Sequence, residues 1–201
     1  MVSMADPLYL SVWFPHFNES DMMPRLLSVV RQFMFSASRP GVSAISVHPV
    51  SWSEATILER RFRPGVDPEQ AIAIASDMLH DDYAYVLQGY WDLWVPAEDA
   101  ADEWIVEPRE VKFIAHGMNF EEGTYQESGH VQVDFGLDTP FLFENVDLTA
   151  TSEPRVRANV QKLVNFTNAV EKNTGISGRV LWSESEENLA QKLIARLQKT
   201  H

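Results

Sequence analysis

The order of its apolar segments is the feature that most constrains how this chain can fold. Short runs of β-branched and aromatic residues alternate with stretches in which apolar residues recur at helical spacing, and Arg39-Pro40-Gly41 separates two of these segments. The first half contains a strand, a helix, two strands, a helix and a strand, predicted over residues 8–14, 23–34, 42–48, 55–62, 68–79 and 82–95. That order favours an α+β fold with helices over an antiparallel sheet, and a ferredoxin-like βαββαβ arrangement of this half.

The second half continues with a ββαβα order of predicted elements. They are two strands of a hairpin, a long helix, a short strand and a final helix, predicted over residues 110–120, 129–137, 152–172, 179–182 and 186–197. The acidic stretch 96–108 is predicted to be a hinge, because it interrupts the apolar pattern. We expect two halves, residues 1–96 and 97–201, packed as one compact unit.

Two helices carry capping signals at their predicted starts. Asp67 is followed by Pro68 and by Gln70, and Ser183 is followed three residues later by Glu186. A short polar side chain with Glu or Gln three positions on satisfies the free N–H groups of a first helical turn. Both patterns therefore predict a helix that begins directly after the capping residue.

The composition indicates a folded protein of a particular chemical class. With 201 residues, of which 45% are hydrophobic, the chain can bury a sizeable core. The absence of cysteine excludes disulfides, thiolate nucleophiles and Cys-ligated metals. The first residues lack a secretory signal pattern, and no run approaches the length of a membrane span. We expect a soluble, cytoplasmic protein with no cofactor and no bound metal.

The negative charge of the chain is concentrated in one central segment. Residues 81–147 hold 16 Asp and Glu against only Arg109 and Lys112, whereas the flanking segments are nearly balanced. Such a segment argues against binding to nucleic acid, which needs clustered Lys and Arg. It also creates a field that attracts basic proteins. The alternatives are an ordinary solubilising surface and weak calcium-binding loops, although no spacing matches an EF-hand.

Aromatic residues accompany this charge. Tyr and Trp suit binding surfaces because each has an apolar body and a polar tip. The predicted strand 82–95 carries Tyr on both faces, so one face could remain available, unless all the rings are core beneath the helices. The predicted partner-binding residues are Tyr83, Tyr85, Tyr90, Trp91, Trp94, Glu98, Asp99, Asp102, Glu103 and Trp104.

A weaker constellation could carry catalysis. The chain has no signature of the common hydrolases, NTPases or dehydrogenases. If the hairpin of 110–120 and 129–137 pairs as predicted, His116, His130 and Asp134 could meet and bind a metal or exchange protons. The alternative is the polar face of a half-buried strand, and a shift of one residue in register would separate His116 from the others.

Three arginines form the last candidate site. Arg60, Arg61 and Arg63 precede a Pro-Gly turn and could bind a carboxylate or phosphate. A solvated strand end, or pairing with acids of the central segment, explains them equally well.

Three hypotheses about function follow. The first is an interaction protein, inhibitor-like, immunity-like or an adaptor, that presents the acidic and aromatic segment to a basic protein partner; small acidic bacterial inhibitors of toxic nucleases use the same physics. The second is an enzyme or a small-molecule or metal-binding protein with a site around His116, His130 and Asp134. The third is a subunit of a homo-oligomer with exposed aromatics at the interface. Charge asymmetry and the lack of catalytic motifs favour the first.

Overall fold

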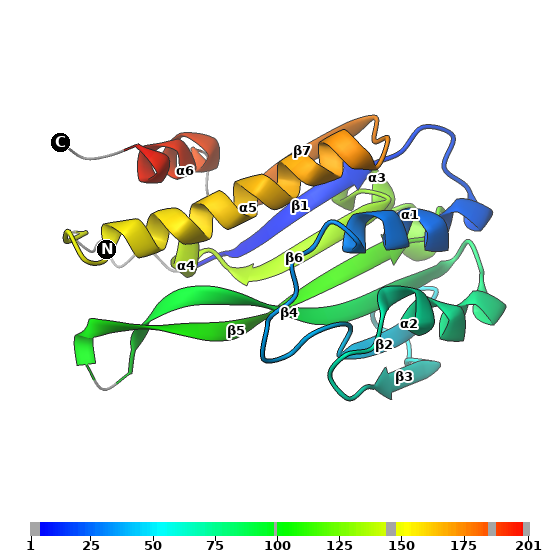
Figure 1. Cartoon of the computed structure of the whole chain (residues 1–201). Coiled ribbons are helices and arrows are strands. Elements are labelled where there is room, and N and C mark those ends of the chain that lie inside the picture. Colours follow the sequence, from blue (N-terminus) through cyan, green and yellow to red (C-terminus); the bar gives the residue numbers. More distant parts are fainter. Residues whose placement is uncertain (1–4, 99, 144–147, 185–187, 199–201) are drawn as a thin grey trace.

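A computed structural model describes residues 5–98, 100–143, 148–184 and 188–198 of the chain. Within these residues, seven strands form one antiparallel sheet in the order β3-β2-β4-β5-β6-β1-β7 (Figure 1). Its strands are β1 (Pro7–Trp13), β2 (Ala44–Pro49), β3 (Leu58–Arg61), β4 (Tyr83–Ala97), β5 (Ala100–His116), β6 (Val131–Leu137) and β7 (Gly178–Ser183). The chain is α+β, as predicted from the order of its segments.

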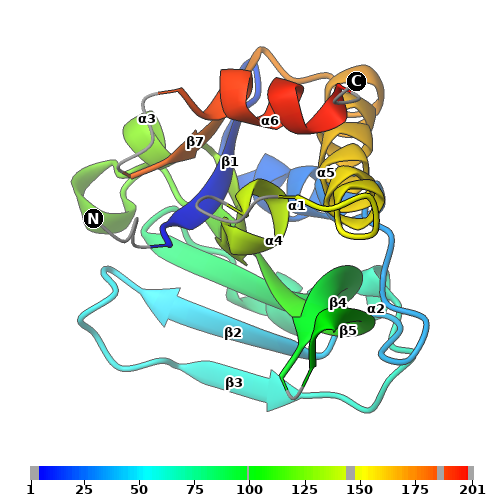
Figure 2. The same ribbon diagram turned by 90° about the vertical axis from the view of Figure 1, so that its left-hand side faces the viewer.

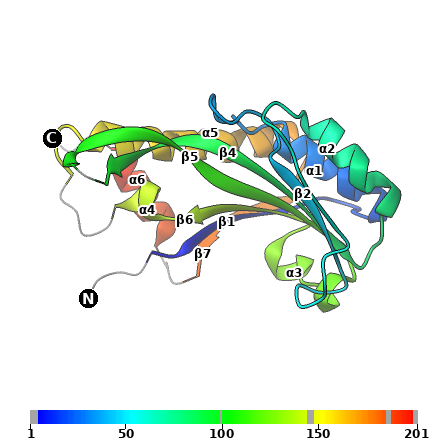
Figure 3. The same ribbon diagram turned by 90° about the horizontal axis from the view of Figure 1, so that it is seen from below.

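Helices cover the two faces of this sheet unequally. The α-helices are α1 (Met22–Val30), α2 (Pro68–Ala75), α3 (Tyr125–Ser128), α4 (Thr139–Leu142), α5 (Glu153–Asn173) and α6 (Leu189–Leu197), with 3-10 turns η1 (Glu19–Asp21), η2 (Ser76–Met78) and η3 (Phe120–Glu122). Figures 2 and 3 show α1, α2 and α5 on one face and α3 on the other. The core lies between the sheet and the three helices, and its centre is a cluster of rings from Phe33, Trp91, Phe113, Phe135 and Phe166.

The ferredoxin-like arrangement of the first half is not confirmed. In that arrangement β1 would pair with β3 and β4, but here it pairs with β6 and β7. The reason is that β5 follows β4 through a short turn and pairs with it along most of its length, so that β5 and β6 separate β4 from β1. Strands from both halves of the chain therefore belong to one sheet.

The predicted hinge at residues 96–108 is wrong, because most of this stretch is strand. β5 begins at Ala100 and pairs continuously with β4 from Trp104 onward. The apolar residues Trp104, Ile105 and Val106 favour a strand, and acids beside them are tolerated because the ribbon is largely exposed. The predicted boundary between the halves thus falls at the tip of a β-hairpin.

The last helix is tied to the rest of the fold through backbone carbonyls. Arg196 of α6 donates from Nε to the Leu142 carbonyl at 2.7 Å and from Nη2 to the Phe143 carbonyl at 3.1 Å. Phe141, Leu142 and Phe143 are buried, as predicted. The predicted capping box of Ser183 and Glu186 lies partly outside the described residues.

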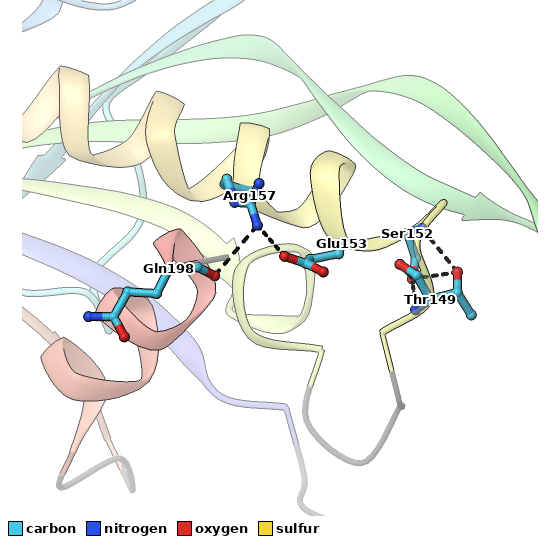
Figure 4. A network of polar contacts seen from close by, with 5 residues as sticks. All are labelled: Thr149, Ser152, Glu153, Arg157 and Gln198. Carbon is cyan, nitrogen blue, oxygen red and sulfur yellow. Dashed lines mark hydrogen bonds and ion pairs between the residues drawn. The ribbon is translucent and has the colours of Figure 1, made fainter. Parts of the chain in front are cut away.

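A side chain near the start of α5 forms a hydrogen bond with the residue that follows α6. Arg157 pairs with Glu153 one turn earlier and donates from Nη2 to the Gln198 carbonyl at 3.5 Å (Figure 4). Just before the helix, the Thr149 N–H donates to the Ser152 hydroxyl at 2.7 Å, and the Ser152 N–H donates to the Thr149 hydroxyl at 3.1 Å. Polar contacts thus fix the turn that precedes α5 and join the first turns of α5 to the residue that follows α6.

The capping box predicted at α2 is present and gives a first testable prediction. The Asp67 carboxylate accepts from the Glu69 N–H at 2.9 Å, and the Gln70 side chain accepts from the Asp67 N–H at 3.3 Å. Asp67→Ala should lower the free energy of unfolding by about 1 kcal/mol, measured by urea denaturation. Asp67→Asn keeps the acceptor and should recover most of that loss, and an unchanged stability of the alanine variant would contradict the prediction.

Candidate functional site

The hairpin of β5 and β6 brings the two predicted histidines together. The His116 N–H donates to the His130 carbonyl at 2.9 Å. The His116 Nδ1–H donates to the Gly129 carbonyl at 3.0 Å, whereas His130 Nδ1 accepts from the Phe14 N–H at 2.9 Å. Both side chains are buried, with 1% and 7% of their surface exposed. The Nδ1 atom of each ring therefore forms a hydrogen bond with the backbone of a neighbouring segment.

Burial keeps both imidazoles neutral. It lowers the pKa of His116 to about 4, against the opposing effects of the Gly129 carbonyl and Glu121. It also lowers the pKa of His130 to about 4, with a further contribution from the neighbouring His116. The His130 ring is stacked between Phe17, at 4.1 Å, and Tyr125, at 5.0 Å. This environment is that of structural histidines.

Asp134 does not join them. The register places Asp134 opposite Lys112, four residues along β5 from His116, which is about 13 Å of extended strand. Its carboxylate accepts from the Gly136 N–H at 2.9 Å. In the part of the chain that the structure describes, no three His, Asp or Glu side chains lie where they could hold a metal ion. The catalytic constellation predicted from the sequence is therefore not assembled.

The aromatic strand β4 divides its rings between the core and the outside. Tyr85 and Trp91 are 0% and 1% exposed, so the prediction that they contact a partner is wrong. Burial raises the pKa of Tyr85 to about 12, and its hydroxyl donates to the Met78 carbonyl at 2.5 Å. Tyr83 is half-buried beside His80, with ring centroids 4.5 Å apart. These rings pack the core because the helices cover that face.

The rings on the opposite face of β4 stay partly open. The Arg39 guanidinium lies over Tyr90 at 4.7 Å, and that of Arg155 lies over Trp94 at 5.3 Å. The buried Asn159 bonds both the N–H and the carbonyl of Trp94, at 2.9 and 2.8 Å. Tyr90 and Trp94 therefore lie on a partly exposed face of β4. The helix α5 packs against the edge of this strand through Asn159.

That ribbon extends beyond the rest of the sheet. β2 pairs with β4 only as far as Gln88, and β6 pairs with β5 only from Lys112. Residues 89–97 and 100–111 thus form a two-stranded projection, here called the arm, which Figure 1 shows at the left. Residues 98–110 hold six acids and a single base, Arg109. The arm is therefore the most acidic projecting part of the fold.

Three other acids of the central segment lie away from the arm. Glu121, Glu122 and Glu127 belong to η3 and α3, at the opposite end of β5 from the arm tip (Figure 1). Among the predicted partner-binding acids, Glu98 and Glu103 are exposed on the arm, Asp99 lies outside the described residues and the Asp102 side chain is not described. The acids that are concentrated in one segment of the sequence are thus not gathered on one surface of the fold.

An apolar hollow lies at the base of the arm. It has a volume of about 660 Å³ and forms where β5 and β4 diverge from the end of β6 and from α4. Its lining is mainly apolar: Leu93, Val95, Phe135, Leu137, Pro140 and Phe143. Glu98, Arg109 and Glu110 also line it, and Arg109 is paired with Glu107 at 2.7 Å. Trp104 packs beside it against Phe143, with centroids 5.1 Å apart.

The three predicted arginines do not converge. Arg60 and Arg61 point to opposite faces of β3 because successive side chains alternate along a strand. Arg60 lies over the Phe62 ring at 5.8 Å, and Arg61 is 3.8 Å from Glu59. With Arg63 exposed after the strand, the cluster seen in the sequence is dispersed.

A polar row that no sequence pattern indicated lies on the face of the sheet opposite α1, α2 and α5. The register aligns Gln88, Lys112, Asp134 and Tyr9 on four adjacent strands. Beside this row lies a second hollow, of about 400 Å³, which Trp52 also lines. These residues are far apart in sequence, and only the strand order brings them together.

Comparisons with known proteins add no constraint. No protein-family model matches the chain, and no match is found among curated proteins or solved structures. Within the described residues, no helix is both long and apolar enough to cross a membrane.

Proposed function

We propose that this protein binds a basic protein partner through the acidic arm and acts as an inhibitor or adaptor of that partner. The observation that carries the proposal is the exposure of apolar side chains among acids on the arm. Ile105 and Val106 are 43% and 49% exposed on opposite faces of β5, and Glu103 and Glu107 lie on the same face as Ile105. Exposed apolar side chains surrounded by charges of one sign are typical of interaction sites.

The apolar hollow at the base of the arm offers a binding site for one side chain of such a partner. A Lys or Arg side chain has an apolar stem and a charged head. Its stem would contact the lining of Leu93, Phe135 and Phe143, while its head would reach Glu98 or Glu110. Both the apolar interior and the acidic rim thus favour a basic side chain, which matches the charge of the arm.

The charge of the arm predicts how the complex should form. Six acids against one base within residues 98–110 attract a basic protein at a distance, which raises the rate of association. This attraction acts over a Debye length of about 10 Å at 0.1 M salt and about 3 Å at 1 M. Association should therefore slow as salt increases.

The test compares two charge reversals within the acidic segment. Glu98→Lys with Glu103→Lys changes the arm, and Glu122→Lys with Glu127→Lys makes the same change of charge beside α3. A partner captured from host lysate at low salt is purified and its association rate with each variant is measured. The arm reversal should slow association about 10-fold or more, and the α3 reversal should have a smaller effect.

Three results would contradict the proposal. They are a partner without a basic surface, equal effects of the two reversals, and capture of no partner at either salt. A second copy of the chain as the bound species, detected by light scattering, would instead support the oligomer hypothesis. Circular dichroism of each variant shows whether loss of binding reflects loss of the fold.

A further inference from the structure

We propose that the hollow beside Trp52 is a binding site for a small, uncharged, polyhydroxylated ligand such as a sugar. This site, called here the Trp52 slot, is separate from the arm and does not depend on the partner-binding proposal. It lies on the sheet face opposite α1, α2 and α5 and has a volume of about 400 Å³, within the range of small-molecule sites.

The floor and one wall of the slot are set by strand register. Val86 and Ile114 are directly opposed on β4 and β5 and form an apolar floor. The next row of the same face contains Gln88, Lys112 and Asp134, which form a polar wall. An apolar floor beside a polar wall suits a ligand that is itself amphipathic, as a sugar ring is.

Trp52 forms the opposite wall. The row beyond the floor is His48, Ala84 and His116. The Trp52 ring packs against both histidines, at 4.8 and 6.2 Å, and so lies on the side where the small Ala84 leaves room. Because 41% of the Trp52 surface is exposed, the indole is available to contact a ligand.

The loop that carries Trp52 is held in place by a strained residue and its contacts. Val50 has a φ of 62°, a left-handed conformation that is unfavourable for a β-branched residue. Its N–H donates to the Asp82 carbonyl and its carbonyl accepts from the Glu121 N–H, each at 2.8 Å. The Glu121 carboxylate in turn accepts from the Trp52 N–H at 3.0 Å. Backbone strain maintained by such contacts is common at binding sites.

The charges and hydrogen-bonding groups of the polar wall determine which class of ligand the slot can bind. Lys112 donates, Asp134 accepts and Gln88 does both, while Glu59 adds a second carboxylate to the slot. An anionic ligand would meet the two carboxylates, whereas a cationic ligand would share them with the Lys112 ammonium, which also lies 3.6 Å from the Glu110 carboxylate. Hydroxyl groups both donate and accept, so a neutral polyol can satisfy all of these side chains without placing like charges together.

The experiment screens the full-length protein against defined sugars. Saturation-transfer NMR is run with glucose, galactose, mannose, N-acetylglucosamine, maltose and cellobiose, and the Kd of each binder is measured by calorimetry. Asp134→Asn and Trp52→Ala should each weaken binding tenfold or more. Asp77→Asn, an exposed acid on η2, and Ile57→Ala, on the same loop but outside the slot lining, are matched controls and should leave the Kd unchanged.

Charged analogues test the class of ligand. Glucuronate and glucosamine should bind at least tenfold more weakly than the neutral sugar that binds best. The proposal is overturned by the absence of saturation transfer from every sugar, by binding that survives both slot variants, or by tighter binding of a charged analogue. Circular dichroism confirms that the slot variants remain folded, since Trp52 and Asp134 are not core residues.

Discussion

Gly129→Ala should prevent folding or lower the free energy of unfolding by more than about 4 kcal/mol, among the largest effects that a single substitution produces. Gly129 has a φ of 92° and a ψ of 157°, a region that only glycine adopts without strain. A Cβ there would lie 2.7 Å from the Val12 nitrogen and 2.9 Å from the Val12 and Val131 oxygens. All three are backbone atoms of paired strands, so none can move without breaking the β1–β6 ladder.

Alanine substitutions at two other glycines distinguish the stability cost of backbone strain from that of steric overlap. Gly65 has a φ of 98° with open space around its Cβ position, so Gly65→Ala should cost about 1–2 kcal/mol from strain alone. Gly178 has neither a positive φ nor a neighbour within 4 Å, and Gly178→Ala should be nearly neutral. Urea denaturation followed by circular dichroism measures all three. A Gly129→Ala variant as stable as Gly65→Ala would show that the strands yield to the added methyl group.

The sequence correctly predicted those features of the fold that depend on the periodicity of a single helix or strand. The helix starting at Asp67, the alternation of Tyr85 and Tyr90 on opposite faces of β4, and the inward packing of Phe141 all follow from spacing along a single element. Such patterns record which side of an element is buried, and the structure confirms the order of elements that they indicated.

The candidate sites depend on pairing between distant strands, which the sequence does not record. Asp134 is separated from His116 and placed beside Lys112 by the β5–β6 register alone. Trp52 reaches the open face because Val50 turns the chain in a left-handed conformation that no turn motif signals. The charges of residues 96–108 masked a strand, since acids are uncommon in strands except at exposed positions, which β5 offers along this stretch.

Acid should destabilise the protein before most carboxylates are protonated, because of His116. Its pKa is about 4 in the folded state, against about 6.5 in an unfolded chain. The stability that neutral His116 contributes is therefore complete above pH 6.5 and is lost as the pH falls toward 4, with no further loss below. The full change corresponds to about 3 kcal/mol, of which about 2 kcal/mol is lost between pH 7 and pH 5. His130 titrates in the same direction and adds to this loss.

A variant at His116 isolates this effect. In His116→Asn the side-chain amide can donate to the Gly129 carbonyl, as Nδ1–H does now at 3.0 Å, but it does not titrate. Free energies of unfolding from urea denaturation at pH 7 and pH 5 should differ by about 2 kcal/mol less in this variant than in the wild-type protein. An equal pH dependence of the two proteins would mean that His116 binds protons in the folded state as readily as in the unfolded chain. Its ring would then have to reach water, and the buried contact between β5 and the start of β6 would have to open without unfolding the sheet.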